Sequence, residues 1–433
     1  MTVPSYACGR ADLPLLGETI GENLRRVAEV HGERTALVDR ARGARLTYRQ
    51  LWERSGRVAG GLAARGVGRG DRVGVWATNR YEWIVLQFAA ARAGAVLVAL
   101  NPTYEAAELA YALRHSGTSL LFHAARHRDT DCAAVVAQVA GECPGLSGTV
   151  VFEDGWDEFE NADPRAAAVA ERLVDFDDPV SIQYTSGTTG RPKGATLTHH
   201  NLVNNGHLVG AQIGVTERDR VCVPVPLFHC FGMVLGTLGA GTHGAALVLP
   251  GGTFDARRTL EAVTDEACTV VYGVPTMYLA MLEDPSLARA DLTSLRTGLI
   301  GGAPCPPDLL EAIRTRLHVP ELSTVCGMTE TSPISTQTLP GDPPGVRDHS
   351  VGRPTPHVEI KVVDPVSGHV VPTGTPGEQC TRGYSVMRGY WADDAATADA
   401  ICPAGWMRTG DMAVMDDDGA IQLVGRIKDV IIR

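Results

Sequence analysis

The chain carries at residues 184–194 the stretch Tyr184-Thr-Ser-Gly-Thr-Thr-Gly-Arg-Pro-Lys-Gly194, directly after the strand-like run Pro179-Val-Ser-Ile-Gln-Tyr184. Glycines let backbone N–H groups approach an anion closely, hydroxyls add donors, and lysine adds a positive charge. The stretch therefore predicts a polyphosphate-binding loop at the end of a strand. It is not a Walker A loop, because that motif places Gly-Lys-Ser/Thr at the start of a helix, whereas here Pro192 precedes Lys193 and Gly194 follows it.

Helical and strand patterns alternate on both sides of this loop. Before it, helices are predicted at residues 51–65, 82–93, 105–115 and 131–140, and strands at 71–76, 95–100 and 119–123. After it, the alternation resumes over residues 219–317, with strands at 268–272 and 297–300. Such repeats are typical of parallel sheets covered by helices on both faces. The sequence therefore predicts an α/β fold with two doubly wound subdomains.

The pattern changes near residue 340. Turns rich in glycine, proline and aspartate separate short strands predicted at residues 358–363, 377–380, 412–415 and 421–424. This spacing indicates a small antiparallel barrel or sheet. We therefore expect an α/β body at residues 1–340, a β-rich subdomain at 341–425 and a hinge at 426–433.

Composition excludes several classes of protein. The chain has 433 residues, of which 44% are hydrophobic and 21% charged, with a net charge of −11. These values are ordinary for a soluble protein, and the acidic balance argues against nucleic acid or an anionic membrane as a partner. Ten cysteines without a CxxC pair favour a reduced, cytoplasmic protein. The apolar window at residues 231–250 contains five glycines, so a buried helix leading into a strand at 245–249 explains it better than a membrane span.

Further segments carry a family resemblance. They are Cys326-Gly-Met-Thr-Glu330, Thr409-Gly-Asp411 and Gly425-Arg-Ile-Lys-Asp429. Alone, each would more often be an ordinary loop. Together with the loop at 184–194, and in this order, they resemble the adenylate-forming superfamily of acyl-CoA synthetases, luciferases and peptide-synthetase adenylation domains. The resemblance covers residues 46–433, and the segments at 226–232, 271–277 and 301–307 are most similar to medium-chain fatty acyl-CoA synthetases.

The resemblance implies an acid–thiol ligase. Such an enzyme joins a carboxylic acid to ATP as an acyl-adenylate and then transfers the acyl group to coenzyme A, with Mg²⁺ as cofactor. The implied acid is a medium-chain fatty acid. Three alternatives stay open: an aryl-CoA ligase for cinnamate- or benzoate-like acids, an acyl-AMP ligase that loads an acyl carrier protein, and a non-catalytic nucleotide-binding domain. The oligomeric state also stays open, with a homodimer as one alternative.

The resemblance also implies roles for individual residues. Lys193 would neutralise phosphate charge, Thr329 would contact the α-phosphate, Glu330 would hold Mg²⁺, and His229 would complete the catalytic set. The implied nucleotide-binding residues are Thr185, Ser186, Gly187, Thr188, Thr189, Gly190, Lys193, Gly302, Ala303, Pro304, Cys326, Gly327, Met328, Thr329, Asp411 and Arg426. One position departs from the family, which usually has an aromatic ring stacked on adenine where Cys326 stands. Losing that ring would weaken adenine binding by about 1–2 kcal/mol.

The segment around His229 resembles the part of the family that shapes the acid pocket. The implied pocket residues are His229, Phe231, Gly232, Met233, Leu235, Gly301, Val325 and Pro333. The run after His229 contains no carboxylate, so an amino-acid substrate is disfavoured because its buried ammonium group would have no partner. Without the resemblance, a histidine in such a segment would more often be an ordinary core histidine.

The end of the chain carries one more expectation. Lys428 corresponds to the family's hinge pivot, and family members continue into a smaller C-terminal domain that carries a lysine used in adenylation. We therefore expect these 433 residues to be the large domain alone, which binds ATP and acid but forms acyl-CoA slowly.

Overall fold

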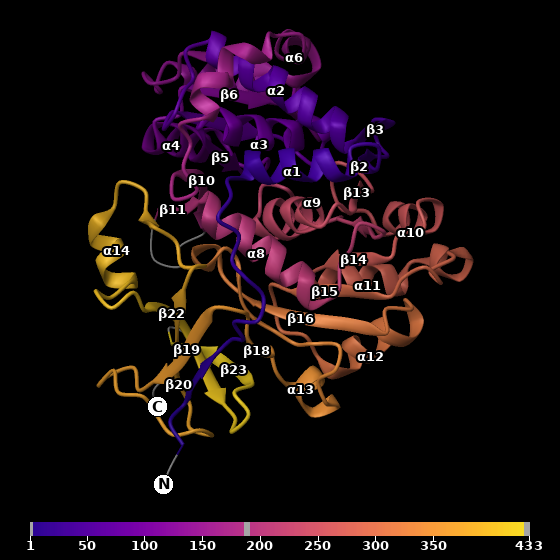
Figure 1. Ribbon diagram of the computed structural model, residues 1–433, viewed down its shortest axis with the longest axis vertical. Helices are drawn as coiled ribbons and strands as arrows, with labels where there is room; N and C mark the ends of the chain where they lie inside the picture. The colour runs from indigo at the N-terminus through magenta and orange to yellow at the C-terminus, as the bar shows by residue number, and fades with distance from the viewer. Residues whose placement is uncertain (1–2, 186–190, 428–433) are drawn as a thin grey trace.

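The computed structural model of the protein describes residues 3–185 and 191–427. Figure 1 shows an upper part, a middle part crossed by a long helix, and a smaller β-rich part at the lower left. Three sheets of seven, nine and five strands form this architecture, together with one two-stranded hairpin, β7 (Arg126–His127) and β8 (Thr130–Asp131).

The seven-stranded sheet is parallel through its centre. β5 pairs in parallel with β4 and β10, and β6 pairs in parallel with β4 and β9. Every residue of β5 is buried, as expected for a strand covered on both faces. In spatial order its strands are β21 (Gly389–Tyr390), β11 (Lys193–Thr198), β10 (Pro179–Thr185), β5 (Val96–Leu100), β4 (Arg72–Trp76), β6 (Leu120–His123) and β9 (Gly148–Val151).

The nine-stranded sheet is parallel in its interior and antiparallel at both edges. The predicted α/β fold with two wound sheets is thus confirmed. In spatial order its strands are β18 (Arg353–Pro354), β17 (Ile334–Gln337), β16 (Glu321–Gly327), β15 (Thr297–Gly301), β14 (Val270–Gly273), β12 (Arg220–Cys222), β13 (Ala246–Leu249), β2 (Thr35–Asp39) and β3 (Ala44–Thr47).

Helices cover these sheets. The helices are α1 (Ile20–His31), α2 (Tyr48–Ala64), α3 (Tyr81–Ala93), α4 (Ala106–Ser116), α5 (Cys132–Ala140), α6 (Phe152–Glu160), α7 (Ala168–Glu171), α8 (His199–Gln212), α9 (Gly239–Thr242), α10 (Ala256–Asp265), α11 (Pro275–Glu283), α12 (Pro307–Arg316), α13 (Pro344–His349) and α14 (Asp394–Ala400), with the 3-10 helices η1 (Pro164–Ala167), η3 (Pro285–Arg289) and η4 (Thr329–Thr331).

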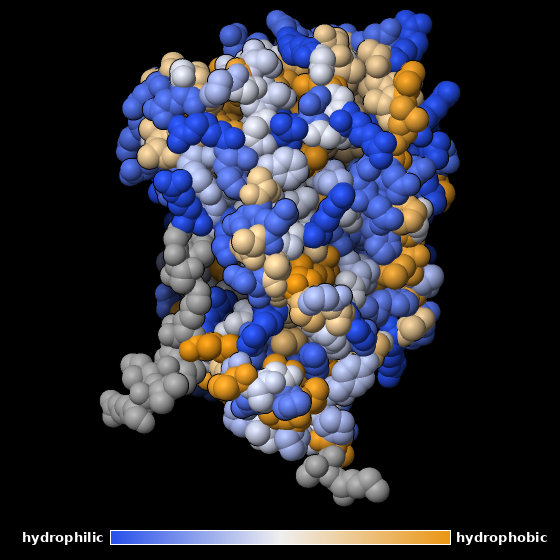
Figure 2. Space-filling model, turned by 90° about the vertical axis from the view of Figure 1, so that its left-hand side faces the viewer, coloured by the Kyte–Doolittle hydropathy of each residue, from blue (hydrophilic) through white to orange (hydrophobic). Residues whose placement is uncertain are grey.

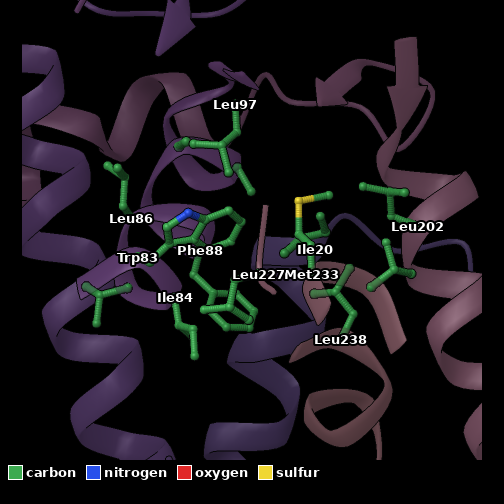
Figure 3. Close-up of a cluster of buried hydrophobic side chains, with 14 of the residues drawn as sticks. Ile20, Trp83, Ile84, Leu86, Phe88, Leu97, Leu202, Leu227, Met233 and Leu238 are labelled. Atoms are coloured by element: carbon green, nitrogen blue, oxygen red, sulfur yellow. The ribbon is translucent and has the colours of Figure 1, made fainter. Parts of the chain in front are cut away.

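One hydrophobic core joins the two large sheets. It contains side chains from both sheets and from the helices packed against them. Figure 3 shows Trp83 and Phe88 of α3 in the same cluster as Leu202 of α8. Met233 and Leu238, from the π-helix η2 (Phe231–Leu238), belong to this cluster too. Because this core continues from one sheet to the other, it fixes the strand ends of one sheet relative to those of the other.

The five-stranded sheet is antiparallel and has a core of its own. This confirms the predicted antiparallel β-rich part. The sheet also takes in a strand from the start of the chain, which the sequence pattern did not reveal. In spatial order its strands are β1 (Tyr6–Cys8), β19 (Val358–Val363), β20 (Gly377–Gly383), β22 (Met407–Met415) and β23 (Ile421–Arg426).

The apolar window at residues 231–250 is a buried helical segment followed by a strand, as predicted. It consists of the π-helix η2 (Phe231–Leu238), then α9 and β13. η2 is buried from its second residue onward. Among the residues that the structure describes, no helix has the length and apolar character needed to cross a membrane.

Candidate active site

The predicted phosphate loop lies between the two arms of a hairpin. β10 and β11 pair antiparallel, and Thr185 stands opposite Lys193 at the open end. The Thr185 hydroxyl donates to the Lys193 carbonyl oxygen at 3.4 Å. The predicted phosphate ligands Ser186, Gly187, Thr188, Thr189 and Gly190 lie outside the described residues.

Helix α4 contacts both arms of this hairpin. The Tyr111 hydroxyl donates to the carbonyl oxygen of Pro192 at 3.1 Å, and the Arg191 guanidinium lies 5.6 Å from the centroid of the Tyr111 ring. On the other arm, the Tyr184 hydroxyl donates to the carbonyl oxygen of Ala112 at 3.0 Å. These contacts anchor the residues on either side of the loop to one helix.

The end of β16 brings the predicted metal ligand to the same place. After β16 the chain forms η4, and the side chain of Glu330 is buried. The Tyr390 hydroxyl donates to Glu330 Oε1 at 2.8 Å, and the Lys193 Nζ lies 4.8 Å from the centroid of the Tyr390 ring. Lys193 and Glu330, which are far apart in sequence, therefore contact the same tyrosine.

The Thr329 hydroxyl lies beside a thiol. Its Oγ1 is 3.6 Å from the Sγ of Cys230. Burial raises the pKa of the Cys230 thiol to about 11, and the nearby Glu330 carboxylate adds to that shift. The thiol therefore stays protonated at neutral pH, and either the thiol or the Thr329 hydroxyl can be the donor in this contact.

The residues assigned to the nucleoside come from two sheets. Gly302, Ala303 and Pro304 follow β15 and are exposed, and Gly302 has a φ of 86°, which favours glycine. Burial first, and then the neighbouring Asp411 carboxylate, raise the pKa of the Cys326 thiol on β16 to about 12. Cys326 of the nine-stranded sheet and Asp411 of the five-stranded sheet are thus neighbours.

Asp411 has a partner on the adjacent strand. It lies opposite Arg426 in the pairing of β22 with β23, and the Arg426 Nε is 3.0 Å from Asp411 Oδ1. Burial raises the pKa of Asp411, and Arg426 opposes that shift. The structure therefore joins the two predicted ribose contacts in one ion pair. The predicted pivot, Lys428, lies outside the described residues.

The predicted acid-pocket residues fall into two groups. His229 is solvent-accessible and Phe231 is half-buried, with its ring centroid 6.0 Å from that of Tyr272. The surrounding protein lowers the pKa of His229, so its imidazole is neutral at pH 7. By contrast, Met233 and Leu235 are each only 1% exposed and belong to the core of the body. His229 and Phe231 are accessible to a bound acid, whereas those two residues pack behind them.

The remaining pocket residues are packed against backbone. Gly301 is paired with Val325 in the β15–β16 ladder, and both are buried. A Cβ at Gly232 would lie 2.2 Å from the carbonyl oxygen of Pro226, and one at Gly327 would lie 1.9 Å from that of Pro333. Only glycine fits such close approaches. Gly327 and the half-buried Met328 then lead from β16 into η4.

The residues at Glu330 fit a magnesium ion. Oε1 accepts the Tyr390 hydroxyl, and Oε2 has no hydrogen-bond partner among the described residues. Within residues 3–185 and 191–427, no three His, Cys, Asp or Glu side chains form a metal cluster. Mg²⁺ in phosphate-transfer sites is commonly held by one or two carboxylates, with phosphate oxygens and water completing its shell. Glu330 would provide the protein ligand of such an ion.

The surface around this site is mixed in character. The side of the molecule that carries α4, α14 and β22 is largely hydrophilic, with hydrophobic residues in small groups (Figure 2). A cavity of about 510 Å³ lies elsewhere, against β9 and α6. β9 is the edge strand opposite to the β11–β21 edge of the seven-stranded sheet, so this cavity is not part of the site.

Sequence reasoning missed Tyr390 and Cys230. Tyr390 lies in Met387-Arg-Gly-Tyr-Trp391, where a glycine beside aromatic residues indicates a turn but gives no role. Cys230 follows His229 in a segment that had already been assigned to the acid pocket. The contacts of both residues join positions that are far apart in the sequence, so no local pattern could have revealed them.

Comparisons with known proteins show the family to which the chain belongs. A model of the family described as "AMP-binding enzyme" matches residues 24–391. The zebrafish (Danio rerio) protein named medium-chain acyl-CoA ligase ACSF2, mitochondrial, is 38% identical over 99% of this chain and 75% of its own length.

Two solved structures are also similar. The N-terminal domain of FACL13 from Mycobacterium tuberculosis, solved with an inhibitor, is 28% identical with a TM-score of 0.86, covering 94% of this chain and all of that one. The anthranilate CoA ligase AuaEII, solved with anthranoyl-AMP, is 27% identical with a TM-score of 0.84, covering 97% of this chain and 79% of that one. The chain therefore belongs to the family of AMP-binding enzymes.

Proposed function

We propose that this protein is an ATP-dependent acyl-CoA ligase that activates a medium-chain fatty acid as its acyl-adenylate and transfers the acyl group to coenzyme A. The observation that carries the proposal is the meeting of Lys193 and Glu330 at Tyr390. A cation and a carboxylate suited to Mg²⁺ that contact one tyrosine support a site for a magnesium-bound polyphosphate. The family match and the relatives named acyl-CoA ligases support it.

The proposed reaction has two steps. In the first, a carboxylate oxygen of the acid attacks the α-phosphorus of ATP, the bond to the β-phosphate breaks, and pyrophosphate leaves. In the second, the sulfur of coenzyme A attacks the acyl carbon and AMP leaves. Lys193 would neutralise charge on the departing phosphates, and the Thr329 hydroxyl would donate to an α-phosphate oxygen. A bound magnesium ion would supply further positive charge at these oxygens.

The nucleoside contacts are part of the same proposal. Asp411 and Arg426 would hold the ribose hydroxyls, since a carboxylate accepts from two vicinal hydroxyls. Gly302, Ala303, Pro304 and Cys326 would border the base, with the loop residues 186–190 around the phosphates and Lys428 as the pivot. The half-buried position of Asp411 and its ion pair with Arg426 support the ribose assignment.

The character of the acid follows from the groups near His229. The side chains that are accessible there are a neutral imidazole and an aromatic ring, Phe231, packed against Tyr272. Each methylene buried on an apolar wall contributes about 0.8 kcal/mol. An apolar chain would therefore bind, whereas a free ammonium group would lack a partner. The same aromatic pair also favours the second candidate, an aryl-CoA ligase.

Pyrophosphate release tests the proposal. Short-, medium- and long-chain fatty acids, benzoate and cinnamate would each be supplied with ATP and Mg²⁺, and products would be identified by mass with coenzyme A or with a phosphopantetheinylated carrier protein. We expect medium-chain acyl-CoA to dominate, with only modest discrimination between neighbouring chain lengths. Aryl-CoA or acyl-carrier products would favour those alternatives. Tight ATP binding without pyrophosphate release under any condition would favour a non-catalytic domain.

The cellular setting is also proposed. All ten cysteines are unpaired thiols, which supports a reduced compartment such as the cytoplasm. A carrier protein as acyl acceptor and a homodimer remain alternatives, and the product masses together with light scattering of the purified protein distinguish them.

A further inference from the structure

The segment that carries Tyr390 is fixed to the start of β11. Tyr390 pairs with Ala195 and Gly389 with Thr196 in the antiparallel pairing of β21 with β11. The Trp391 N–H donates to the carbonyl oxygen of Gly194 at 2.7 Å. These bonds set the position of Tyr390 relative to Lys193, two residues before Ala195.

A second set of contacts holds this segment from its other side. The backbone N–H of Tyr390 donates to Thr397 Oγ1 at 2.9 Å, from the first turns of α14. At Gly389 the backbone has a φ of 151°, and a Cβ there would lie 2.9 Å from Thr397. Gly389 therefore permits a close approach that any other residue would obstruct.

The same segment also holds Glu330. The Met387 N–H donates to the Glu330 carbonyl oxygen at 2.8 Å, and the Tyr390 hydroxyl donates to Glu330 Oε1 at 2.8 Å. Both the backbone and the carboxylate of Glu330 thus depend on residues 387–390. The ring of the same tyrosine lies 4.8 Å from the Lys193 ammonium group, within the range of a cation–π contact.

We propose that Tyr390 is a positioning residue for adenylation. Its hydroxyl fixes one oxygen of Glu330 so that the other faces the magnesium ion, and its ring directs Lys193 toward the phosphates. This inference rests on the proposed function, because it assumes that Glu330 and Lys193 hold magnesium and ATP.

The direction of the hydrogen bond suits this role. An ionised carboxylate can only accept, so the Tyr390 hydroxyl is the donor in its contact with Glu330 Oε1. A buried carboxylate oxygen that loses its donor is left unsatisfied, which is costly. Without the hydroxyl, Glu330 would be free to turn, and the geometry available to a bound cation would be less well defined.

The test compares two substitutions at Tyr390. Tyr390→Phe removes the hydroxyl and keeps the ring, whereas Tyr390→Leu removes both. Two quantities are measured: the Mg²⁺ concentration that gives half-maximal pyrophosphate release, and the rise in Tm that ATP produces with Mg²⁺ relative to ATP with EDTA. We expect Tyr390→Phe to raise the half-maximal Mg²⁺ concentration about 10-fold and to reduce the magnesium-dependent rise in Tm. Tyr390→Leu should in addition weaken ATP binding measured without magnesium.

The matched control is Tyr48→Phe. Tyr48 is another buried tyrosine, whose hydroxyl donates to the carbonyl oxygen of Ala245 at 2.6 Å, within the core of the body. This variant should lower Tm while leaving the magnesium dependence as in the wild type. A double-mutant cycle adds a further check: in a Glu330→Gln background, Tyr390→Phe should have little further effect on magnesium dependence.

Failure of this inference can be distinguished from failure of the proposed function. If the wild type releases pyrophosphate and Tyr390→Phe shows the same magnesium dependence in both measurements, the positioning role is overturned and the ligase proposal stands. If the wild type releases no pyrophosphate with any acid, the ligase proposal fails. The magnesium-dependent Tm shift still decides the role of Tyr390 in that case: a reduced shift supports it and an unchanged shift overturns it.

Discussion

Two parts of the site hold their charged side chains in different ways. Glu330 is buried and is held by its backbone, by a tyrosine hydroxyl and by its place between β16 and η4. Asp411 and Arg426 form a single ion pair on neighbouring strands, and the Arg426 side chain is 59% exposed. The first arrangement fixes a carboxylate in one position, whereas the second permits adjustment.

This difference suits the two tasks proposed for the site. Chemistry at phosphorus requires charges held within a fraction of an ångström, so the groups near the phosphates benefit from burial and several anchors. Binding of a ribose tolerates a looser contact. If this comparison is correct, substitutions at Glu330 should affect turnover strongly, and substitutions at Arg426 should have small effects that depend on salt.

The largest effect is expected at Glu330. Glu330→Ala should lower the rate of adenylation about 10²–10³-fold, because it removes the carboxylate that would hold magnesium at the reacting phosphates. Single-turnover pyrophosphate release at saturating ATP measures this rate.

Glu321→Ala is the matched control for that substitution. Glu321 lies at the opposite end of β16 and is exposed, so its loss should leave the rate unchanged. Equal rates for Glu330→Ala and the wild type would remove Glu330 from the reaction and favour a binding-only protein.

An intermediate effect on the free energy of unfolding is expected when the pH is lowered. His199, at the start of α8, is buried; its Nδ1 accepts the Ile20 N–H at 3.1 Å, and its Nε2 has no partner among the described residues. Burial lowers the pKa of His199 to about 4. The unfolded chain, with an ordinary histidine pKa near 6.5, therefore binds more protons between pH 6.5 and 4.

Because the unfolded chain binds more protons, the free energy of unfolding falls as the pH falls. The contribution of neutral His199 is fully present above pH 6.5 and is lost as pH falls toward 4, which amounts to about 2 kcal/mol between pH 7 and pH 5. Denaturant unfolding at both pH values measures it. His199→Gln should reduce this dependence, and His369→Gln, at an exposed histidine, should not. An unchanged dependence in His199→Gln would place the acid sensitivity elsewhere.

The smallest effect is expected at Arg426. Arg426→Gln should change the free energy of unfolding by about 1 kcal/mol or less at low salt, and by less still at high salt, because exposed ion pairs are screened. It should also raise the KM for ATP a few-fold if Arg426 contacts the ribose. Arg165→Gln, which breaks another exposed pair far along the sequence, is the control and should leave this KM unchanged. A large loss of stability in Arg426→Gln would contradict the comparison.

The sequence predicted best those elements whose buried residues follow a local pattern of apolar residues. The apolar run at 95–100 became β5, and the alternating run at 358–363 became β19. β11 was not predicted, since Lys-Gly-Ala-Thr-Leu-Thr has little apolar content and is held in place by its neighbours β10 and β21. Its pairing with β21, which lies far along the sequence, leaves no local signal.

The same reasoning applies within the site. The family motifs identified Lys193 and Glu330, but their common contact, Tyr390, depends on a two-residue strand added to β11. Met233 and Leu235 are close to Phe231 in sequence, yet successive residues of a helix point in different directions, and these two lie in the core. The sequence motif could assign this segment to the acid pocket, but only the helix geometry shows which of its side chains are accessible.

The pairing of β1 with β19 has a consequence for the order of synthesis. β1 (Tyr6–Cys8) is made well before its partner strand β19 (Val358–Val363), because translation proceeds from the amino end of a chain. During translation β1 therefore has no sheet partner until β19 has emerged. Contacts of such long sequence separation form late in folding. We therefore expect the pairing of β1 with β19 to form late in folding, and a label near β1 would report when it forms.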